Sequence, residues 1–133
     1  MRAVCIDCWC EVPLDQSVCP NCGATIDSDS PSYERLLFWA LKSSTPEHRA
    51  QICKILGLRG YRSAVPHLIE RINDHNVAVG IAALRALGAI GDDSAIPVIE
   101  KALSSESLPV RAAAREALRE MGVDGHESNP MAD

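Results

Sequence analysis

Aromatic residues are scarce in this chain of 133 residues, at 4% of the sequence against 47% hydrophobic residues in all. A core of this composition is aliphatic and rich in alanine, which favours closely packed helices over a β-sheet. Basic residues are fewer than acidic residues, with 13 lysines and arginines against 18 aspartates and glutamates. The net charge of −5 argues against nucleic acid as a partner, since proteins that coat it are usually basic.

Long apolar runs are missing as well. No stretch of the sequence approaches the roughly 20 residues of a transmembrane helix, and the first residues lack the apolar segment of a signal peptide. We therefore expect a cytoplasmic protein without membrane contact, and a monomer by default. No Ser/His/Asp set, phosphate-binding loop or carboxylate pair stands out, so we expect no catalytic activity.

Cysteine is concentrated at the N-terminus, where five of the six cysteines fall within the first 22 residues. Cys5 and Cys8 form one C-x2-C pair, and Cys19 and Cys22 form a second. Two such pairs supply four thiolates for a tetrahedral site, which suits one structural Zn²⁺, although iron also binds four thiolates. Without a secretory signal, this clustering favours metal binding over disulfides. Cys10 is not expected to be a ligand, because four thiolates already complete the site.

The segments CWCEVP (8–13) and VCPNCGA (18–24) resemble the short zinc-ribbon domain found at the ends of many prokaryotic proteins. That family usually has Gly-Ala where Trp9 and Cys10 stand here. The resemblance implies a zinc ribbon over residues 1–27, in which the metal substitutes for a core that so short a segment cannot build. Its acidic residues make the ribbon a poor surface for phosphates.

After a polar linker at residues 28–31, the sequence repeats with a period of 31 residues as far as residue 122. LGLRGYRSAVP (56–66) aligns with LGAIGDDSAIP (87–97). Residues that begin and end helices keep the same register. The expected N-caps are Ser32, Ser63 and Ser94, and likewise Thr45, Asn76 and Ser107, and the expected helix ends are Gly60, Gly91 and Gly122.

Apolar residues recur with helical spacing inside each repeat, as in Val65, Leu68, Ile69 and Ile72. The pattern predicts six helices of two alternating types and therefore a mainly α fold. We call residues 32–43, 64–74 and 95–104 the B helices, and residues 46–58, 77–89 and 108–121 the A helices. In the core row of the A helices, Cys53 and Leu84 are followed by Arg115, so the stack is expected to end there. The polar residues 123–133 are expected to be disordered.

The runs AVPHLIE (64–70) and VRAAAREAL (110–118) resemble HEAT repeats, and more narrowly the repeats named after phycobilin lyase subunits. The resemblance implies an α-solenoid over residues 32–122, with the B helices along a concave face. Repeats of this family often pair an aspartate with a following arginine along the stack. Asp74, Arg49 and Arg111 fit that ladder, whereas Gly80 and Ser105 interrupt it.

A protein-binding adaptor is the function that we expect, because solenoid faces bind other chains and rarely assemble catalytic groups unaided. The candidate partner-binding residues are Trp39, His67, Glu70, Arg71, Asp74, Glu100 and Lys101. Two alternatives stay open: an accessory or lyase-like subunit acting on a chromophorylated protein, and nucleic-acid binding through the ribbon and the locally basic middle of the chain. His126-Glu127 resembles the paired residues of di-iron HEAT-type hydroxylases, which need several such pairs.

The first B helix is unusually apolar. In the 31-residue register Trp39 aligns with Glu70 and Lys101, and Phe38 aligns with Ile69 and Glu100. An uncovered solenoid end invites aggregation, so we predict that the ribbon caps this helix with Trp39 or Phe38 at the contact. The alternative is that Trp39 remains exposed as an anchor for a partner.

Overall fold

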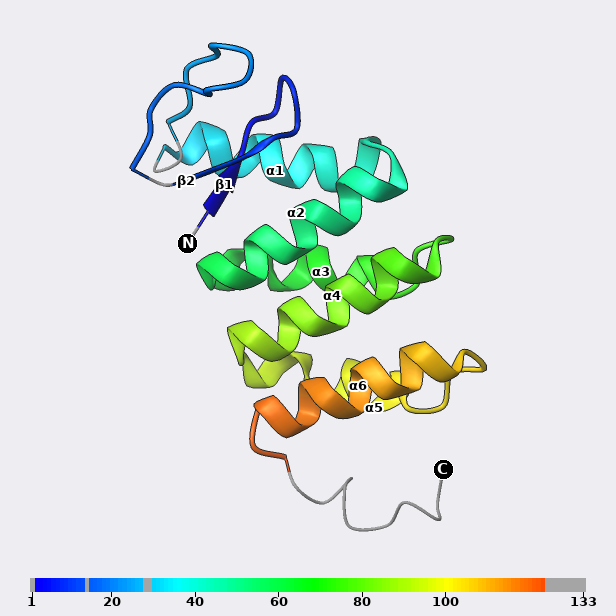
Figure 1. Ribbon diagram of the computed structural model, residues 1–133. Helices are drawn as coiled ribbons and strands as arrows, with labels where there is room; N and C mark the ends of the chain where they lie inside the picture. Colours follow the sequence, from blue (N-terminus) through cyan, green and yellow to red (C-terminus); the bar gives the residue numbers. More distant parts are fainter. Residues whose placement is uncertain (1, 14, 28–29, 124–133) are drawn as a thin grey trace.

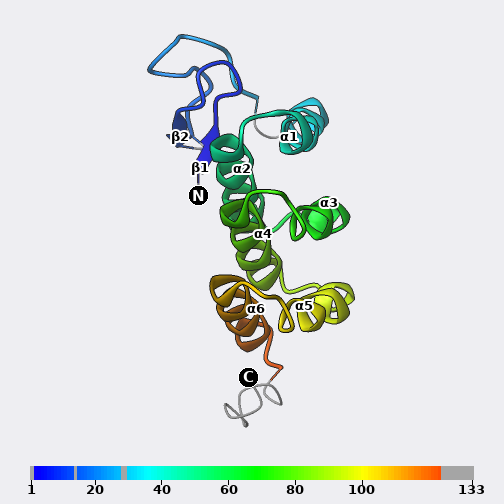
Figure 2. The same cartoon turned by 90° about the vertical axis from the view of Figure 1, so that its right-hand side faces the viewer.

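Two layers of helices and a small N-terminal module make up the computed structural model, which describes residues 2–13, 15–27 and 30–123. One layer holds α2 (Pro46–Arg59), α4 (Val77–Ile90) and α6 (Leu108–Glu120), the predicted A helices. The other, the B layer, holds α1 (Pro31–Ser43), α3 (Val65–Arg71) and α5 (Ile96–Ala102). Figure 1 shows the helices stacked from the N-terminal module downward, and Figure 2 shows the two layers as two columns. The predicted α-solenoid is confirmed, and none of the described helices is long and apolar enough to cross a membrane.

Capping at the A helices follows the sequence prediction. The side chains of Thr45, Asn76 and Ser107 each accept a backbone N–H from the first turn of α2, α4 and α6, which satisfies a donor that the helix leaves unpaired. Gly60 and Gly91 end α2 and α4 with φ of 66° and 72°. These values lie in the left-handed region, which glycine enters without steric cost.

Capping at the B helices differs from the prediction. The cap of α1 is Ser30 rather than Ser32, because the Ser30 hydroxyl accepts the amides of residues 32 and 33. Ser63 and Ser94 are not caps, since each lies in a 3-10 turn, η1 (Arg62–Ala64) or η2 (Asp93–Ala95), that leads into α3 or α5. Each turn takes up one residue that the periodicity assigned to the helix, and α3 and α5 also end at Arg71 and Ala102, before the predicted ends at residues 74 and 104.

The A helices approach one another closely at two points that are 31 residues apart. A Cβ atom built on Gly57 would lie 2.8 Å from the Cα of Ala86, and one built on Gly88 would lie 2.8 Å from the Cα of Ala117. Such separations are shorter than van der Waals contact, so only glycine fits at either position. The 31-residue period therefore reflects two features of the A helices: an apolar stripe and a backbone contact between neighbouring helices.

One rung of the predicted Asp–Arg ladder forms. The Arg49 guanidinium donates two hydrogen bonds of 2.9 Å to the two carboxylate oxygens of Asp74, and Arg71 donates a third at 3.2 Å. At the next copy of the arginine position, Gly80 brings α4 close to the end of α3, where an added Cβ would lie 2.8 Å from the Ile72 carbonyl oxygen. A side chain at residue 80 would disturb this packing, so the ladder gives way there to a backbone contact.

The N-terminal module contains a two-stranded antiparallel sheet of β1 (Arg2–Val4) and β2 (Glu11–Pro13), with Ala3 opposite Val12. Its small core includes Val4, Val12 and Ile26, all buried. The module is tied to α1 through Tyr33, whose hydroxyl accepts the Val4 N–H at 2.8 Å and donates to the Val4 carbonyl at 2.7 Å. The sheet edge therefore finds its hydrogen-bond partner in the first helix of the solenoid.

The module packs on the end of the helical stack, but mainly against α2 rather than on α1 as predicted, and the contact residues differ from the predicted Trp39 and Phe38. The Trp9 ring stacks on His48 of α2 with centroids 4.0 Å apart, and Gln51 donates to the Trp9 carbonyl at 3.0 Å. Trp39, in contrast, is 63% exposed, because it lies on the solvent face of α1. Phe38 turns toward α3, where it stacks on His67 at 4.2 Å.

We expect the substitutions Gly57→Ala and Gly88→Ala to lower the free energy of unfolding by about 1–3 kcal/mol each, because the added methyl forces α2, α4 and α6 apart. Helix propensity alone has the opposite sign, favouring alanine by about 1 kcal/mol. Urea unfolding followed by circular dichroism measures the difference. An increase in stability in either variant would contradict the close contact.

Candidate functional site

The two C-x2-C segments fold into matching loops. In the first, the Cys5 amide donates to the Cys10 carbonyl at 2.9 Å, and the Trp9 amide donates to the Cys5 carbonyl at 2.7 Å. The second loop, from Cys19 to Ala24, repeats both hydrogen bonds at 2.8 and 2.9 Å. Each loop turns its two cysteine side chains toward the other loop, so the spacing in the sequence is translated into one cluster of sulfur atoms.

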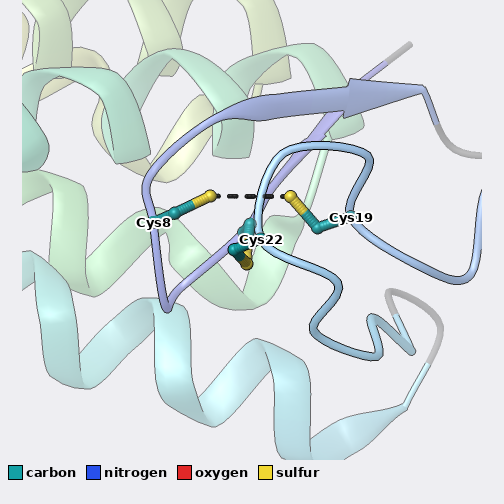
Figure 3. A group of neighbouring side chains, drawn as sticks. Cys8, Cys19 and Cys22 are labelled. Carbon is teal, nitrogen blue, oxygen red and sulfur yellow. Dashed lines mark hydrogen bonds between the residues drawn. The ribbon is translucent and has the colours of Figure 1, made fainter.

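The Sγ atoms of Cys5, Cys8, Cys19 and Cys22 all lie within 4.8 Å of one another. Cys8 and Cys19 are 3.5 Å apart at sulfur (Figure 3), and Cys5 and Cys22 are 3.6 Å apart. A tetrahedral ion with metal–sulfur bonds of about 2.3 Å places its thiolates about 3.8 Å apart, whereas a disulfide brings them to about 2.05 Å. All four cysteines are free, so the cluster fits one metal ion, with Cys10 outside it.

The sulfur atoms influence one another's protonation. A hydrogen bond from the Asn21 side chain is the main cause that lowers the pKa of the Cys8 thiol to about 6. The backbone amide of Ala24 lowers the pKa of Cys22, but burial and the neighbouring cysteines outweigh it and raise this pKa to about 12. Thiolates so close together need a cation, and binding one displaces the remaining protons. Metal binding is therefore expected to weaken as the pH falls.

Trp9 occupies a position where the matching loop has glycine. Its φ is 65°, against 79° at Gly23, and a residue with a Cβ adopts this left-handed conformation at a cost of roughly 1–2 kcal/mol. Stacking on His48 and the hydrogen bond from Gln51 offset that cost. The tryptophan thus connects the cysteine cluster to α2. This role was not predicted from the sequence. The available signal was that Trp9 stands where the zinc-ribbon family usually has glycine.

The B-layer residues predicted to bind a partner are placed differently by the structure. Glu70 and Lys101 are exposed on α3 and α5, and Trp39 is exposed on α1. Three others are half-buried: His67, Arg71 and Glu100.

The prediction that Asp74 contacts a partner is corrected by the structure, because the side chain is only 2% exposed. Burial raises the pKa of its carboxyl, but the hydrogen bonds from Arg49 and the Asn76 amide lower it below the usual range. The carboxylate therefore serves as an internal ion-pair partner that holds α2 against the turn after α3. Cys53 is also internal, and burial raises the pKa of its thiol to about 12, as expected for a buried apolar side chain.

Comparison with known proteins identifies the repeats. A family model described as HEAT repeats matches residues 34–119. Among solved structures, human deoxyhypusine hydroxylase in complex with glycerol is similar with a TM-score of 0.66 and 21% sequence identity, over 74% of this chain and 35% of that chain. The chain thus spans about a third of that enzyme's length, and the likeness is one of fold. No curated protein sequence matches significantly. His126 and Glu127 lie outside the described residues.

We expect the protein purified without added metal to contain about one metal ion per chain. Cys5→Ser and Cys19→Ser each remove a buried ligand and should abolish metal retention, because three thiolates leave the coordination open. Cys10→Ala is the matched control and should retain the full amount. Elemental analysis of the three variants measures this, and loss of metal from Cys10→Ala would contradict the assignment.

Removing the metal with a strong chelator should release Trp9 while most of the helical signal survives, because the helices share a large core and the N-terminal module buries only a few apolar residues. In a Trp39→Phe background, Trp9 is the remaining tryptophan, so its emission should shift to longer wavelength. Circular dichroism on the same sample reports the helices. Collapse of most of the helical signal would show instead that the two modules unfold as one unit.

Proposed function

Because the chain belongs to the HEAT-repeat family, we propose that it is a protein-binding adaptor that holds a partner chain against its B layer. The observation that carries this proposal is the exposure of Trp39, at 63%. The matching positions of the next two repeats hold the charged residues Glu70 and Lys101, which are also exposed. A tryptophan in a position that the fold leaves open to solvent is typical of a binding hot spot.

The surroundings of Trp39 support a protein partner. Leu36, one turn earlier on α1, is 45% exposed, and Arg35 and Lys42 are exposed on the same helix. An apolar centre with charged residues around it resembles the anatomy of a protein interface. Burying a large aromatic side chain there contributes about 2–3 kcal/mol, enough to be measured when it is removed.

The cysteine cluster has a structural role in this proposal. We infer that its ion is zinc, because four thiolates leave no open coordination position and closed sites of this kind are typical of structural zinc. The ion keeps the Trp9 loop in place and so keeps the N-terminal module on the end of the stack. Free thiols at all six cysteines suit a reducing compartment such as the cytoplasm.

The enzymatic alternatives have less support. Deoxyhypusine hydroxylase is an enzyme by its name, but a likeness at 21% identity extends only to the fold, and fold does not determine chemistry. Among the described residues, the group suited to a metal ion consists of cysteines alone. The lyase-like alternative rests on the resemblance of the repeats, and no contact in the structure adds to it.

Site-specific crosslinking tests the adaptor proposal. A photo-crosslinking amino acid placed at position 39 should form adducts with a protein in the cells of origin. The same amino acid at position 116, an exposed residue of α6 in the other layer, is the matched control and should form few. Adducts that contain nucleic acid, or equal protein adducts at both positions, would contradict the proposal.

A further inference from the structure

A groove of about 320 Å³ lies where the N-terminal module meets α1. We call it the junction groove. We propose that it binds a basic, apolar peptide segment of the partner, with a bulky aliphatic side chain in the groove and a lysine or arginine beside it. The inference rests on the proposed adaptor function and deepens it, because it assigns a second contact of the same partner to a surface that both modules build.

The groove exists because the module covers the end of the stack only in part. Trp9 and Glu11 contact α2 through His48 and Lys54, and Tyr33 anchors the first turn of α1. In Figure 2 the strands lie beside α2, while α1 stands in the other column. The next turn of α1 is left open, so Leu36 lines the groove and remains 45% exposed.

The lining suits an aliphatic side chain. Ile6 and Ile26 from the module and Tyr33 and Leu36 from α1 provide its apolar surface. A volume of about 320 Å³ is at the lower end of ligand pockets, which measure roughly 300–1,000 Å³, and it fits one or two side chains rather than a large cofactor. Trp39 lies one turn beyond Leu36, so a bound segment that leaves the groove along α1 reaches the proposed hot spot.

The negative charge of the groove favours a basic residue next to the aliphatic side chain of the bound peptide. Asp7 and Asp27 line the groove and are exposed, and the described lining contains no lysine, arginine or histidine. Cys5 also lines it, and four thiolates around a divalent ion carry a net charge of about −2. Arg35 and Lys42 are exposed on α1 beside Trp39 but do not line the groove. A cation beside the groove is therefore attracted by the N-terminal module.

Model peptides test the inference on the full metal-loaded chain. The probe is a fluorescein-labelled ten-residue peptide of alternating leucine and lysine, followed by fluorescence anisotropy. We expect saturable binding at one site. A peptide with glutamate in place of lysine should not bind, and one with serine in place of leucine should bind at least tenfold more weakly. Absence of saturable binding by the leucine–lysine peptide, or equal binding by the glutamate peptide, would overturn the inference.

Variants locate the site. Asp27→Lys and Leu36→Ser should each weaken binding roughly tenfold, a loss typical of reversing a charge or removing an apolar contact in an interface. Asp15→Lys makes the same charge change at an exposed position outside the lining and should change the affinity less than twofold. Circular dichroism and metal content confirm that each variant folds. Equal losses in Asp15→Lys and Asp27→Lys would show general charge attraction and overturn the inference.

Two further results separate this inference from the adaptor proposal. Chelation should abolish peptide binding while the helices persist, because most of the residues that line the groove belong to the metal-dependent module. If Leu36→Ser and Asp27→Lys leave the affinity unchanged while position 39 still crosslinks a protein, the inference about the junction groove is wrong and the adaptor function stands. If the peptide binds as expected but position 39 captures no protein, the adaptor surface on the B layer is wrong.

Discussion

The close contact between neighbouring A helices is the constraint on which the rest of the structure depends. At Gly57 and Gly88 the backbones of α2, α4 and α6 come so near that a single added methyl would overlap the facing alanine. This contact sets how far each repeat lies from the next, and therefore how the B helices are spaced along the other layer. It also explains why glycine and alanine, rather than larger apolar residues, occupy the contact points between the A helices.

The N-terminal module solves a different problem. It buries only a few apolar residues, and its two loops meet at four cysteines that could hold a metal ion. Trp9 then links this cluster to the solenoid through a strained backbone conformation and a stacked histidine. The cysteine cluster and the contact with α2 consequently involve the same loop.

Exposure, more than residue type, separates the structural residues from the candidate binding residues. Asp74 and Trp39 are both candidate partner-binding residues in the sequence, one as a charged residue and the other as a large aromatic residue in a helical repeat. The structure buries the aspartate between two arginines and leaves the tryptophan open. A buried paired charge holds helices together, while an exposed tryptophan supplies apolar area that a partner can cover.

Periodicity and local chemistry alone determined the helical repeats, the caps of the A helices and the four-cysteine set. Each depends on residues close together in the chain, such as the side chain of Thr45 and the amide that it caps, or the two cysteines of one loop. Tertiary structure alone decided that the module docks on α2 through Trp9, and that Ser63 and Ser94 enter 3-10 turns. These outcomes depend on which surfaces meet when the helices stack, and a single helix carries no record of its neighbour's distance.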